Sequence, residues 1–344
     1  MKKPVLLLLG ALLVSVSLLS ACSSDDDGDS TAEATATTAS ETATATEAAT
    51  ETTTAEASAT TAAGAEGTAT DLLGREVTVA SPPERIVTLS PSAIEILYAV
   101  GGEAVGRSTT AVHPEGVESL EDIGPSYQPN FEAVLALDPD LVIADASAQA
   151  HLLDQITAAL GDVPVVFVGA VVYDDVATSM GILGQLLGKQ TEAEAAIAEM
   201  EAAKADAEAA AADQTPPKVL IIDGAPDDFF VALPDSWPGS LVEVLGGENV
   251  AASQPAAGPF PGYTQLSLEA ILASEADVIL AITLGPPGAT LSQGILGETA
   301  YADLPAVQNG RVHEIDAEVF LQAPGPRAAD GLRELAEYLY PAAR

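Results

Sequence analysis

Two tyrosines stand at matching places ahead of two similar segments of the chain. Tyr127 lies five residues before Glu132, and Tyr263 lies six residues before Glu269. Aromatic residues make up only 4% of the sequence, so this matched placement predicts a shared role. Tyrosine rings stack well on flat, partly apolar ligands. We therefore expect both rings to contact one ligand across a cleft. Further candidates for the same surface are Gln128, Trp237 and Phe260, with packing inside its own lobe as the alternative for each aromatic ring.

Basic side chains and histidines are few, so each is a candidate for binding an anionic or metal-containing ligand. Arg107 follows a predicted strand, and Arg327 stands in a Gly-Pro-Arg sequence, where capping its helix or pairing within its lobe is the alternative. Haem would require a tyrosine or histidine axial ligand, and zinc or manganese a cluster of histidines and carboxylates. His113, His151 and His313 are dispersed along the chain. Their spacing predicts surface or core histidines and no metal site.

Motifs of common catalytic sites are missing from the sequence. No G-x-S-x-G occurs, which a nucleophile elbow would require. Gly188-Lys189 does not complete a phosphate-binding loop, because Leu183 stands where that motif has glycine and Gln190 where it has serine or threonine. The sequence therefore predicts a binding protein and not an enzyme.

The elements that must position these residues are repeated. Glu132 to Asp145 reads EAVLALDPDLVIAD, and Glu269 to Ile282, 137 positions later, reads EAILASEADVILAI. Each copy begins with the apolar spacing of a helix and ends in a short apolar run, typical of a parallel strand buried on both faces. A second pair, Ile96 to Val105 and Leu241 to Val250, repeats at an offset of 145 with Gly-Gly in each copy. The repeats predict an α/β protein of two Rossmann-like lobes with central sheets flanked by helices.

One long helix should join the lobes. Residues 192–213 are rich in Ala, Glu and Lys, have few large apolar residues, and are followed by Pro216-Pro217. High helix propensity with a weak apolar stripe is typical of a helix that crosses between lobes. We place the N-terminal lobe at 71–190, the linking helix at 191–215 and the C-terminal lobe at 216–344.

The first 70 residues are predicted to carry targeting signals. A charged start and an apolar run end at Leu19-Ser20-Ala21-Cys22, so 1–21 is interpreted as a secretory signal peptide. This ending resembles a bacterial lipobox, which implies a lipid on Cys22 and a membrane-anchored mature protein. Cys22 is the only cysteine, which excludes an intrachain disulfide. Residues 22–70 hold ten acidic and no basic residues among Ser, Thr and Ala, which predicts a disordered stalk.

The folded part is strongly acidic. From residue 71 onward the chain holds 41 acidic and 10 basic residues. Such a surface repels nucleic acid and anionic lipid headgroups, so we expect no nucleic-acid partner. After the signal, no apolar run approaches the roughly 20 residues that a membrane-spanning helix requires.

Taken in order, several segments resemble the solute-binding lipoproteins of ABC importers for iron–siderophore complexes, haem and cobalamin, which have the class III periplasmic-binding-protein fold. The resemblance covers nearly all of 71–344. It rests on RIVTLSPSAIEIL (85–97), PNFEAVLALDPDLVIAD (129–145), LVEVLGGENV (241–250), LSLEAILASEADVILA (266–281), NGRVHEID (309–316) and PGPRAADGLRELAEYL (324–339). The resemblance implies two lobes joined by one rigid helix, with a ligand clamped between them and little hinge motion.

The same resemblance implies a function and a location. The protein would be an extracytoplasmic, lipid-anchored monomer, at the cell surface or in the periplasm. It would deliver a metal chelate to an ABC permease dimer with its ATPase subunits, and it would need no cofactor. An iron–siderophore complex is the first candidate for the ligand, with cobalamin and haem as alternatives. The alternative function of another class is a structural or adhesive lipoprotein that binds no small molecule.

The resemblance also carries roles to individual residues. Glu132 and Glu269, which head one helix in each lobe, would dock on permease arginines, with stabilisation of the helix dipole as the alternative. Loops that follow strands reach the ligand in this family, which adds Ser92, Ala146 and Ser147 as candidates for ligand binding.

Overall fold

The computed structural model describes residues 67–341, except 81, 226–227, 258–259 and 286–287. The signal peptide, Cys22 and nearly all of the predicted stalk lie outside the described residues. Within them, no helix has the length and apolar character needed to cross a membrane. Both lobes belong to one compact unit of the chain.

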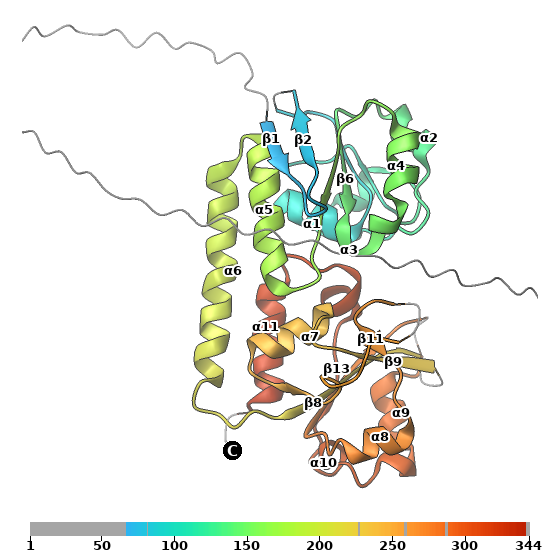
Figure 1. Ribbon diagram of the computed structural model, residues 1–344, viewed down its shortest axis with the longest axis vertical. Coiled ribbons are helices and arrows are strands. Elements are labelled where there is room, and N and C mark those ends of the chain that lie inside the picture. Colours follow the sequence, from blue (N-terminus) through green and yellow to red (C-terminus); the bar gives the residue numbers. More distant parts are fainter. Residues whose placement is uncertain (1–66, 81, 226–227, 258–259, 286–287, 342–344) are drawn as a thin grey trace, which may run out of the picture. The chain divides into compact units, whose positions relative to one another are not determined.

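The N-terminal lobe, blue to green in Figure 1, is built on a parallel sheet. The sheet has five strands in the order β5-β4-β3-β6-β7. Its strands are β3 (Ile86–Thr88), β4 (Gly106–Arg107), β5 (Glu121–Asp122), β6 (Leu141–Asp145) and β7 (Val165–Val168). The helices are α1 (Pro91–Ala99), α2 (Phe131–Ala136), α3 (Ala146–Gln149), α4 (Leu153–Leu160) and α5 (Tyr173–Leu187), with short 3-10 turns at Val117–Ser119 and Ala150–Leu152. The continuous apolar runs of β6 and β7 are fully buried, as the sequence predicts.

A hairpin precedes this sheet, and it begins earlier than the sequence predicts. β1 (Gly67–Thr70) pairs antiparallel with β2 (Glu76–Val79), and the turn between them includes Gly74, which has positive φ. Residues 67–70 were assigned to the stalk because their Thr- and Ala-rich composition continues that segment. Gly67 packs so closely on α5 that a Cβ there would lie 2.7 Å from the Leu186 carbonyl oxygen. Residues 67–70 are therefore part of the first lobe and not of the predicted stalk.

The C-terminal lobe has a six-stranded mixed sheet of order β11-β9-β8-β12-β13, with β10 beside the start of β8. Its strands are β8 (Lys218–Ala225), β9 (Asp228–Ala232), β10 (Glu248–Asn249), β11 (Tyr263–Thr264), β12 (Val278–Thr283) and β13 (Val312–Glu314). The helices are α7 (Trp237–Val244), α8 (Leu268–Ala273), α9 (Leu291–Gly297), α10 (Pro305–Gln308) and α11 (Ala328–Leu339), with a 3-10 turn at Thr299–Tyr301 and a π-helical turn, η4, at Glu318–Gln322. Strands β8, β12 and β13 are parallel, and β9 reverses direction.

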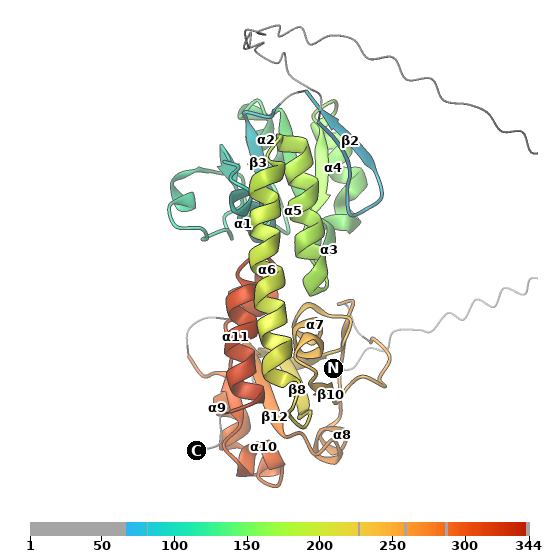
Figure 2. The ribbon, with the colours of Figure 1, turned by 90° about the vertical axis from the view of Figure 1, so that its left-hand side faces the viewer.

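The long helix α6 (Gln190–Ala211) joins the lobes, close to the predicted range of 191–215. It packs on α5 of the first lobe and α11 of the second (Figure 2). Its few buried residues, such as Met200 and Ala203, face these helices, while most of its Glu residues stay exposed. One continuous cluster of buried side chains runs from α1 and α5 through α6 to α7 and α11, so the lobes share a core.

Both internal repeats are also repeats of backbone shape. Asp138 and Glu275, 137 positions apart, are the two residues other than glycine with positive φ in the described part, at 48° and 51°. Each occupies the tight turn between the repeated helix and the strand, α2 to β6 and α8 to β12. A left-handed turn at these two positions alone confirms that the matched segments fold alike.

The two Gly-Gly pairs likewise end α1 and α7 in the same way. Gly101 and Gly246 have φ of 73° and 69°, a conformation in which glycine is unstrained. A Cβ on Gly102 would lie 2.2 Å from the Leu97 side chain, and a Cβ on Gly247 would lie 2.7 Å from Val242. In each pair, the first glycine therefore allows the left-handed turn, and the second leaves space for a side chain of the preceding helix.

Candidate functional site

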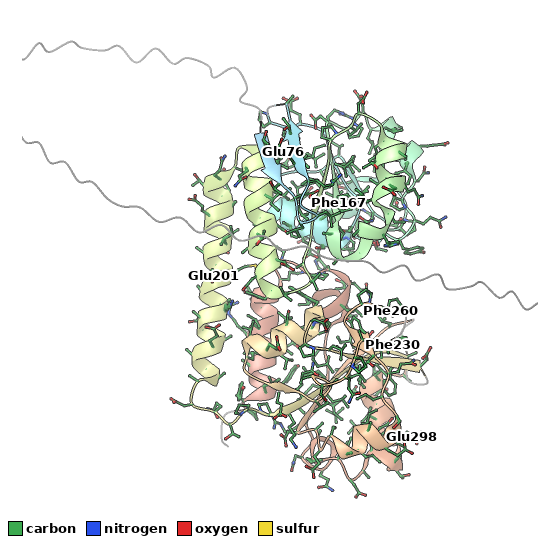
Figure 3. The ribbon with its side chains drawn as sticks, in the orientation of Figure 1. Glu76, Phe167, Glu201, Phe230, Phe260 and Glu298 are labelled. Carbon is green, nitrogen blue, oxygen red and sulfur yellow. The ribbon has the colours of Figure 1, made fainter. Side chains whose placement is uncertain are left out.

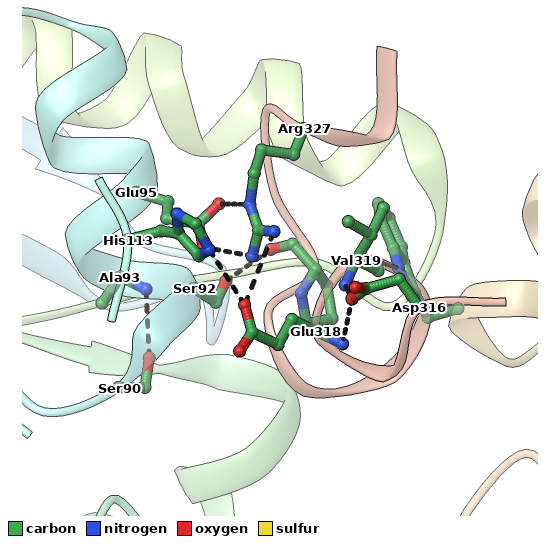
Figure 4. Close-up of polar contacts among 11 residues, drawn as sticks. Ser90, Ser92, Ala93, Glu95, His113, Asp316, Glu318, Val319 and Arg327 are labelled. Carbon is green, nitrogen blue, oxygen red and sulfur yellow. Dashed lines mark hydrogen bonds and ion pairs between the residues drawn. The ribbon is translucent and has the colours of Figure 1, made fainter. Parts of the chain in front are cut away.

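An ion pair between a buried glutamate and a partly exposed arginine joins the two lobes (Figure 4). Glu95 on α1 is 6% exposed. Its carboxylate accepts two hydrogen bonds from Arg327 at the start of α11, from Nε to Oε2 at 2.8 Å and from Nη2 to Oε1 at 2.7 Å. Ser90 caps α1 by accepting a hydrogen bond from the Ala93 amide, which fixes the helix end beside this pair. The bidentate geometry orients both side chains, as is typical of arginine and a carboxylate.

Two more contacts accompany this pair. The Ser92 hydroxyl of α1 donates to the Pro324 carbonyl oxygen at 2.6 Å. His113 Nε2 lies 3.0 Å from Oε2 of Glu318, on the turn η4 that follows β13 (Figure 4). We call these six residues, Ser92, Glu95, His113, Glu318, Pro324 and Arg327, the interlobe network. All three contacts cross from one lobe to the other.

A cavity of about 480 Å³ adjoins the interlobe network. Its lining comes from α1, from the loop after β4 and from the start of α11, namely Glu95, Tyr98, Ala99, His113, Pro114, Glu115, Pro326 and Arg327. Both lobes therefore contribute to its wall. Aromatic and aliphatic surface with a few charged groups is the usual lining of a small-molecule site.

The carboxyl edge of the N-terminal sheet presents the predicted Tyr127. Its side chain is 76% exposed, and Gln128 beside it is exposed as well. The loop that carries them is fixed by Gln149, whose amide donates to the carbonyl oxygens of Ser126 at 2.6 Å and Leu89 at 3.1 Å. A free ring on an ordered loop is well placed to stack on a ligand.

A second hollow lies at the same edge. Ala146 and Ser147 follow β6 directly and line a cavity of about 260 Å³ together with Leu72, Leu73, Ala170, Val171 and Asp175. Asp145 holds the start of α3 by accepting hydrogen bonds from the Ser147 and Ala148 amides. These two candidates therefore remain on an accessible surface.

The carboxyl edge of the C-terminal sheet carries an aromatic group (Figure 3). Phe260 is 53% exposed, and its ring meets the ring of Phe230 edge to face at a centroid distance of 5.3 Å. Tyr263 packs more deeply, against the shared core, and burial raises the pKa of its hydroxyl well above the ordinary value. Tyr263 and Tyr127 thus differ in exposure, although the repeat predicts equal roles.

Three residues predicted to contact a ligand are buried and hydrogen-bonded within the protein. Trp237 is 5% exposed, and its indole N–H donates to the Val319 carbonyl oxygen at 2.9 Å. Arg107 is 8% exposed and gives its guanidinium donors to the carbonyl oxygens of Val117, Ser108 and Glu118. Ser92 is fully buried in its contact with Pro324. The polar groups of these three side chains bond to backbone carbonyl oxygens of the protein.

His113 and Glu318 are the site residues that the sequence reasoning missed as a pair. His113 was assigned to the surface or core, and Glu318 belongs to no motif. The sequence signal that could have indicated them is their position: His113 lies in the loop after β4, and Glu318 lies shortly after β13. The other two histidines lie elsewhere: His151 is exposed, and His313 stacks on Tyr338 at 4.2 Å, with burial lowering its pKa. Among the described residues, no group of three or more His, Asp or Glu side chains is placed to hold a metal ion.

The two glutamates predicted to dock on a permease have matching surroundings. Glu132 is the second residue of α2, capped by Asn130, and Glu269 is the second residue of α8, capped by Ser267. Both are exposed. Hydrogen bonds from its own amide and from the Ser267 hydroxyl hold the pKa of Glu269 below its usual value. Both carboxylates are therefore presented to solvent in the same way.

Comparison with known proteins now places the chain in a class. The periplasmic binding protein family matches residues 86–319, which is more than half of the chain. The chain belongs to this family, whose members are solute-binding proteins and not enzymes. The two-lobed architecture is the class III fold of that family.

Particular relatives agree with the class. An uncharacterised ABC transporter substrate-binding lipoprotein of Bacillus subtilis is 28% identical over 77% of this chain and 82% of its own length. A cobalamin-binding protein of Halobacterium salinarum is 28% identical over 75% of this chain and 70% of its own. The structure of the periplasmic haem-binding protein RhuT of Roseiflexus is 30% identical with a TM-score of 0.63, covering 76% of this chain and 99% of that one.

Proposed function

We propose that this protein captures an uncharged or cationic metal chelate between its lobes and delivers it to the permease of an ABC importer. The family supports solute binding, and relatives of the chain serve ABC transporters. A cavity with walls from both lobes supports capture between them. The charge of the site supports the restriction on the ligand.

The proposal that the ligand is uncharged or cationic rests on the bonding of the basic side chains. Apart from Lys189, every Lys and Arg side chain between 67 and 341 is bonded to protein carboxylates or carbonyl oxygens: Arg75, Arg85, Arg107, Lys204, Lys218, Arg311, Arg327 and Arg333. Lys189 lies beside Gly101 and does not line the interlobe cavity. Glu95 and Glu115 line that cavity. An anionic ligand would meet carboxylates there and no free cation from the described residues.

This argument ranks the ligand classes that the resemblance leaves open. A corrinoid is uncharged or cationic, and the Halobacterium relative is a cobalamin-binding protein. Ferric siderophores of the hydroxamate type are also uncharged or cationic and stay in the proposal. Haem carries two carboxylates, and catecholate siderophores are strongly anionic, so both are disfavoured.

A charge-matched panel of chelates tests this function. We expect cyanocobalamin or an uncharged ferric hydroxamate to bind at least about tenfold more tightly than haem or a ferric tris-catecholate. Like charges 4 Å apart repel by about 1 kcal/mol in water and about 4 kcal/mol near a protein surface, and 1.4 kcal/mol is tenfold in affinity. Quenching of intrinsic fluorescence gives the four dissociation constants.

Two variants serve as controls for that panel. Glu115→Gln, which removes a carboxylate from the cavity wall, should reduce the discrimination against anionic chelates, whereas Glu337→Gln, at an exposed position of α11, should leave it unchanged. Tightest binding by haem or by the tris-catecholate would contradict the charge restriction. Absence of binding to all four chelates would contradict the proposed ligand class.

Tyr127 does not line the interlobe cavity, and it is proposed to stack on a part of the chelate that extends beyond it. Replacing it with alanine should weaken binding about two- to tenfold, because one aromatic contact contributes about 0.5–1.5 kcal/mol beyond its buried area. The ring is exposed in the free protein, so the melting temperature should not change. Tyr127→Phe keeps the ring and should bind as the parent does; equal affinities for all three proteins would show that Tyr127 lies outside the site.

We also propose that Cys22 is lipidated and holds the mature protein on the extracytoplasmic face of the membrane. The signal-like run that ends at Cys22 supports this, as does the lipoprotein name of the Bacillus relative. Residues 22–66 would then form the tether. The protein would act as a monomer on a dimeric permease.

A further inference from the structure

Asp223 on β8 is a buried carboxylate with one unpartnered oxygen among the described residues. It is 6% exposed, near the carboxyl end of the strand, and among the described residues its Oδ1 has no hydrogen-bond partner. Burying an unpaired carboxylate is costly, so such a group in a native structure calls for an explanation. The interlobe network does not include it.

Two aromatic residues, Phe230 and Tyr263, share one face of the sheet with this carboxylate. Asp223 pairs directly with Phe230 across β8 and β9, and residues directly opposite in an antiparallel pair share a face. Ala232 lies on the same face two residues on, and it pairs with Tyr263 of β11. The charge of Asp223 also acts on the Tyr263 hydroxyl.

Phe260 lies at the solvent-exposed edge of these rings, whereas the unpartnered Oδ1 of Asp223 is itself buried. Phe260 covers Phe230 edge to face and is itself 53% exposed. Figure 3 shows both phenylalanines on the side of the C-terminal lobe that faces the N-terminal lobe. A carboxylate beside aromatic faces is a combination that attracts organic cations, because the ring quadrupole and the negative charge act together.

We propose that Asp223, Phe230, Phe260 and Tyr263 form a subsite for a cationic alkylammonium group, which selects chelates that carry such a group. The inference rests on the proposed function and deepens it. The ammonium would donate to the unpaired carboxylate oxygen while its alkyl part contacts the rings. The C-terminal lobe would then bind a cationic substituent of the ligand, while Tyr127 of the N-terminal lobe stacks on the flat face of the ligand.

The ionisation of Asp223 fits this role. Burial raises its pKa to about 7. A bound cation stabilises the ionised form and so lowers the pKa, and a proton is released at neutral pH. The hydroxyls of Tyr263 and of Ser236, at the start of α7, also act at this face.

A small probe tests the subsite without the chelate. Titrating the protein, labelled with carboxyl-13C aspartate, with n-butylammonium at pH 7 should shift the Asp223 resonance toward its ionised position. n-Butanol, which has the same alkyl part and no charge, should leave the resonance unmoved. Asp223→Asn should weaken n-butylammonium binding at least tenfold, measured by tyrosine fluorescence, while Asp228→Asn, an exposed aspartate on the same hairpin, should not.

The outcomes separate this inference from the proposed function. An unmoved Asp223 resonance at saturating n-butylammonium, or equal effects of the amine and the alcohol, overturns the subsite whether or not the Asn variant folds. Binding of cyanocobalamin or a ferric hydroxamate would still support the proposed function in that case. Binding of n-butylammonium without binding of any chelate would support the subsite and contradict the proposal that the ligand is a metal chelate.

Discussion

Alanine at both Glu132 and Glu269 is expected to reduce uptake about tenfold or more while leaving ligand affinity unchanged. The two carboxylates head equivalent helices and are exposed. Charged groups at such an interface mainly steer and orient the encounter, and steering raises association rates about 10- to 1,000-fold. Uptake of labelled ligand into cells or permease proteoliposomes measures the effect.

The matched control removes the same charge from another surface. Glu194 and Glu201 are exposed on α6, so changing both to alanine should leave uptake close to that of the parent. Added salt should depress docking of the parent more than docking of the Glu132/Glu269 variant, because it screens exposed charges. Normal uptake with a lowered melting temperature would favour the helix-dipole account and reject docking.

Replacing Arg327 with methionine is expected to destabilise the protein by about 3–5 kcal/mol, because Glu95 would remain buried without a partner. The double variant with Glu95→Gln should recover much of this loss. Urea unfolding gives the free energies. Arg333 on the same helix pairs with exposed Asp330, so Arg333→Met should cost no more than about 1 kcal/mol. Similar unfolding midpoints for the two single variants would show that the interlobe ion pair does not support the fold.

The fold was predictable where the signal is local and repeated. The buried strands β6 and β12 come from continuous apolar runs, and the helix-to-strand units around them recur at a fixed offset. The linking helix follows from its composition within a few residues. Composition failed at β1, because Thr and Ala occur both in the stalk and in this strand, and its order comes from pairing with β2 and packing on α5.

The site was less predictable because its contacts join distant residues. Glu95 and Arg327 are 232 positions apart, and neither alone indicates a partner in the other lobe. Trp237 and Arg107 were sensible candidates by residue type, but their N–H groups satisfy remote carbonyl oxygens. Exposure, which decides whether Tyr127 or Tyr263 offers a free ring, is a property of packing that the repeat does not encode.

The shared core also bears on how such proteins can change over evolution. Every contact of the interlobe network joins α1 or the loop at His113 to the single segment 318–327, and the apolar cluster runs unbroken through α6. Recombination at the linking helix would separate these matched surfaces. Exchange of a whole lobe with a relative is therefore constrained, whereas the loops at Tyr127 and Phe260 can diverge without disturbing either contact surface. New ligand preferences in this lineage should accordingly arise by loop substitution within an inherited pair of lobes.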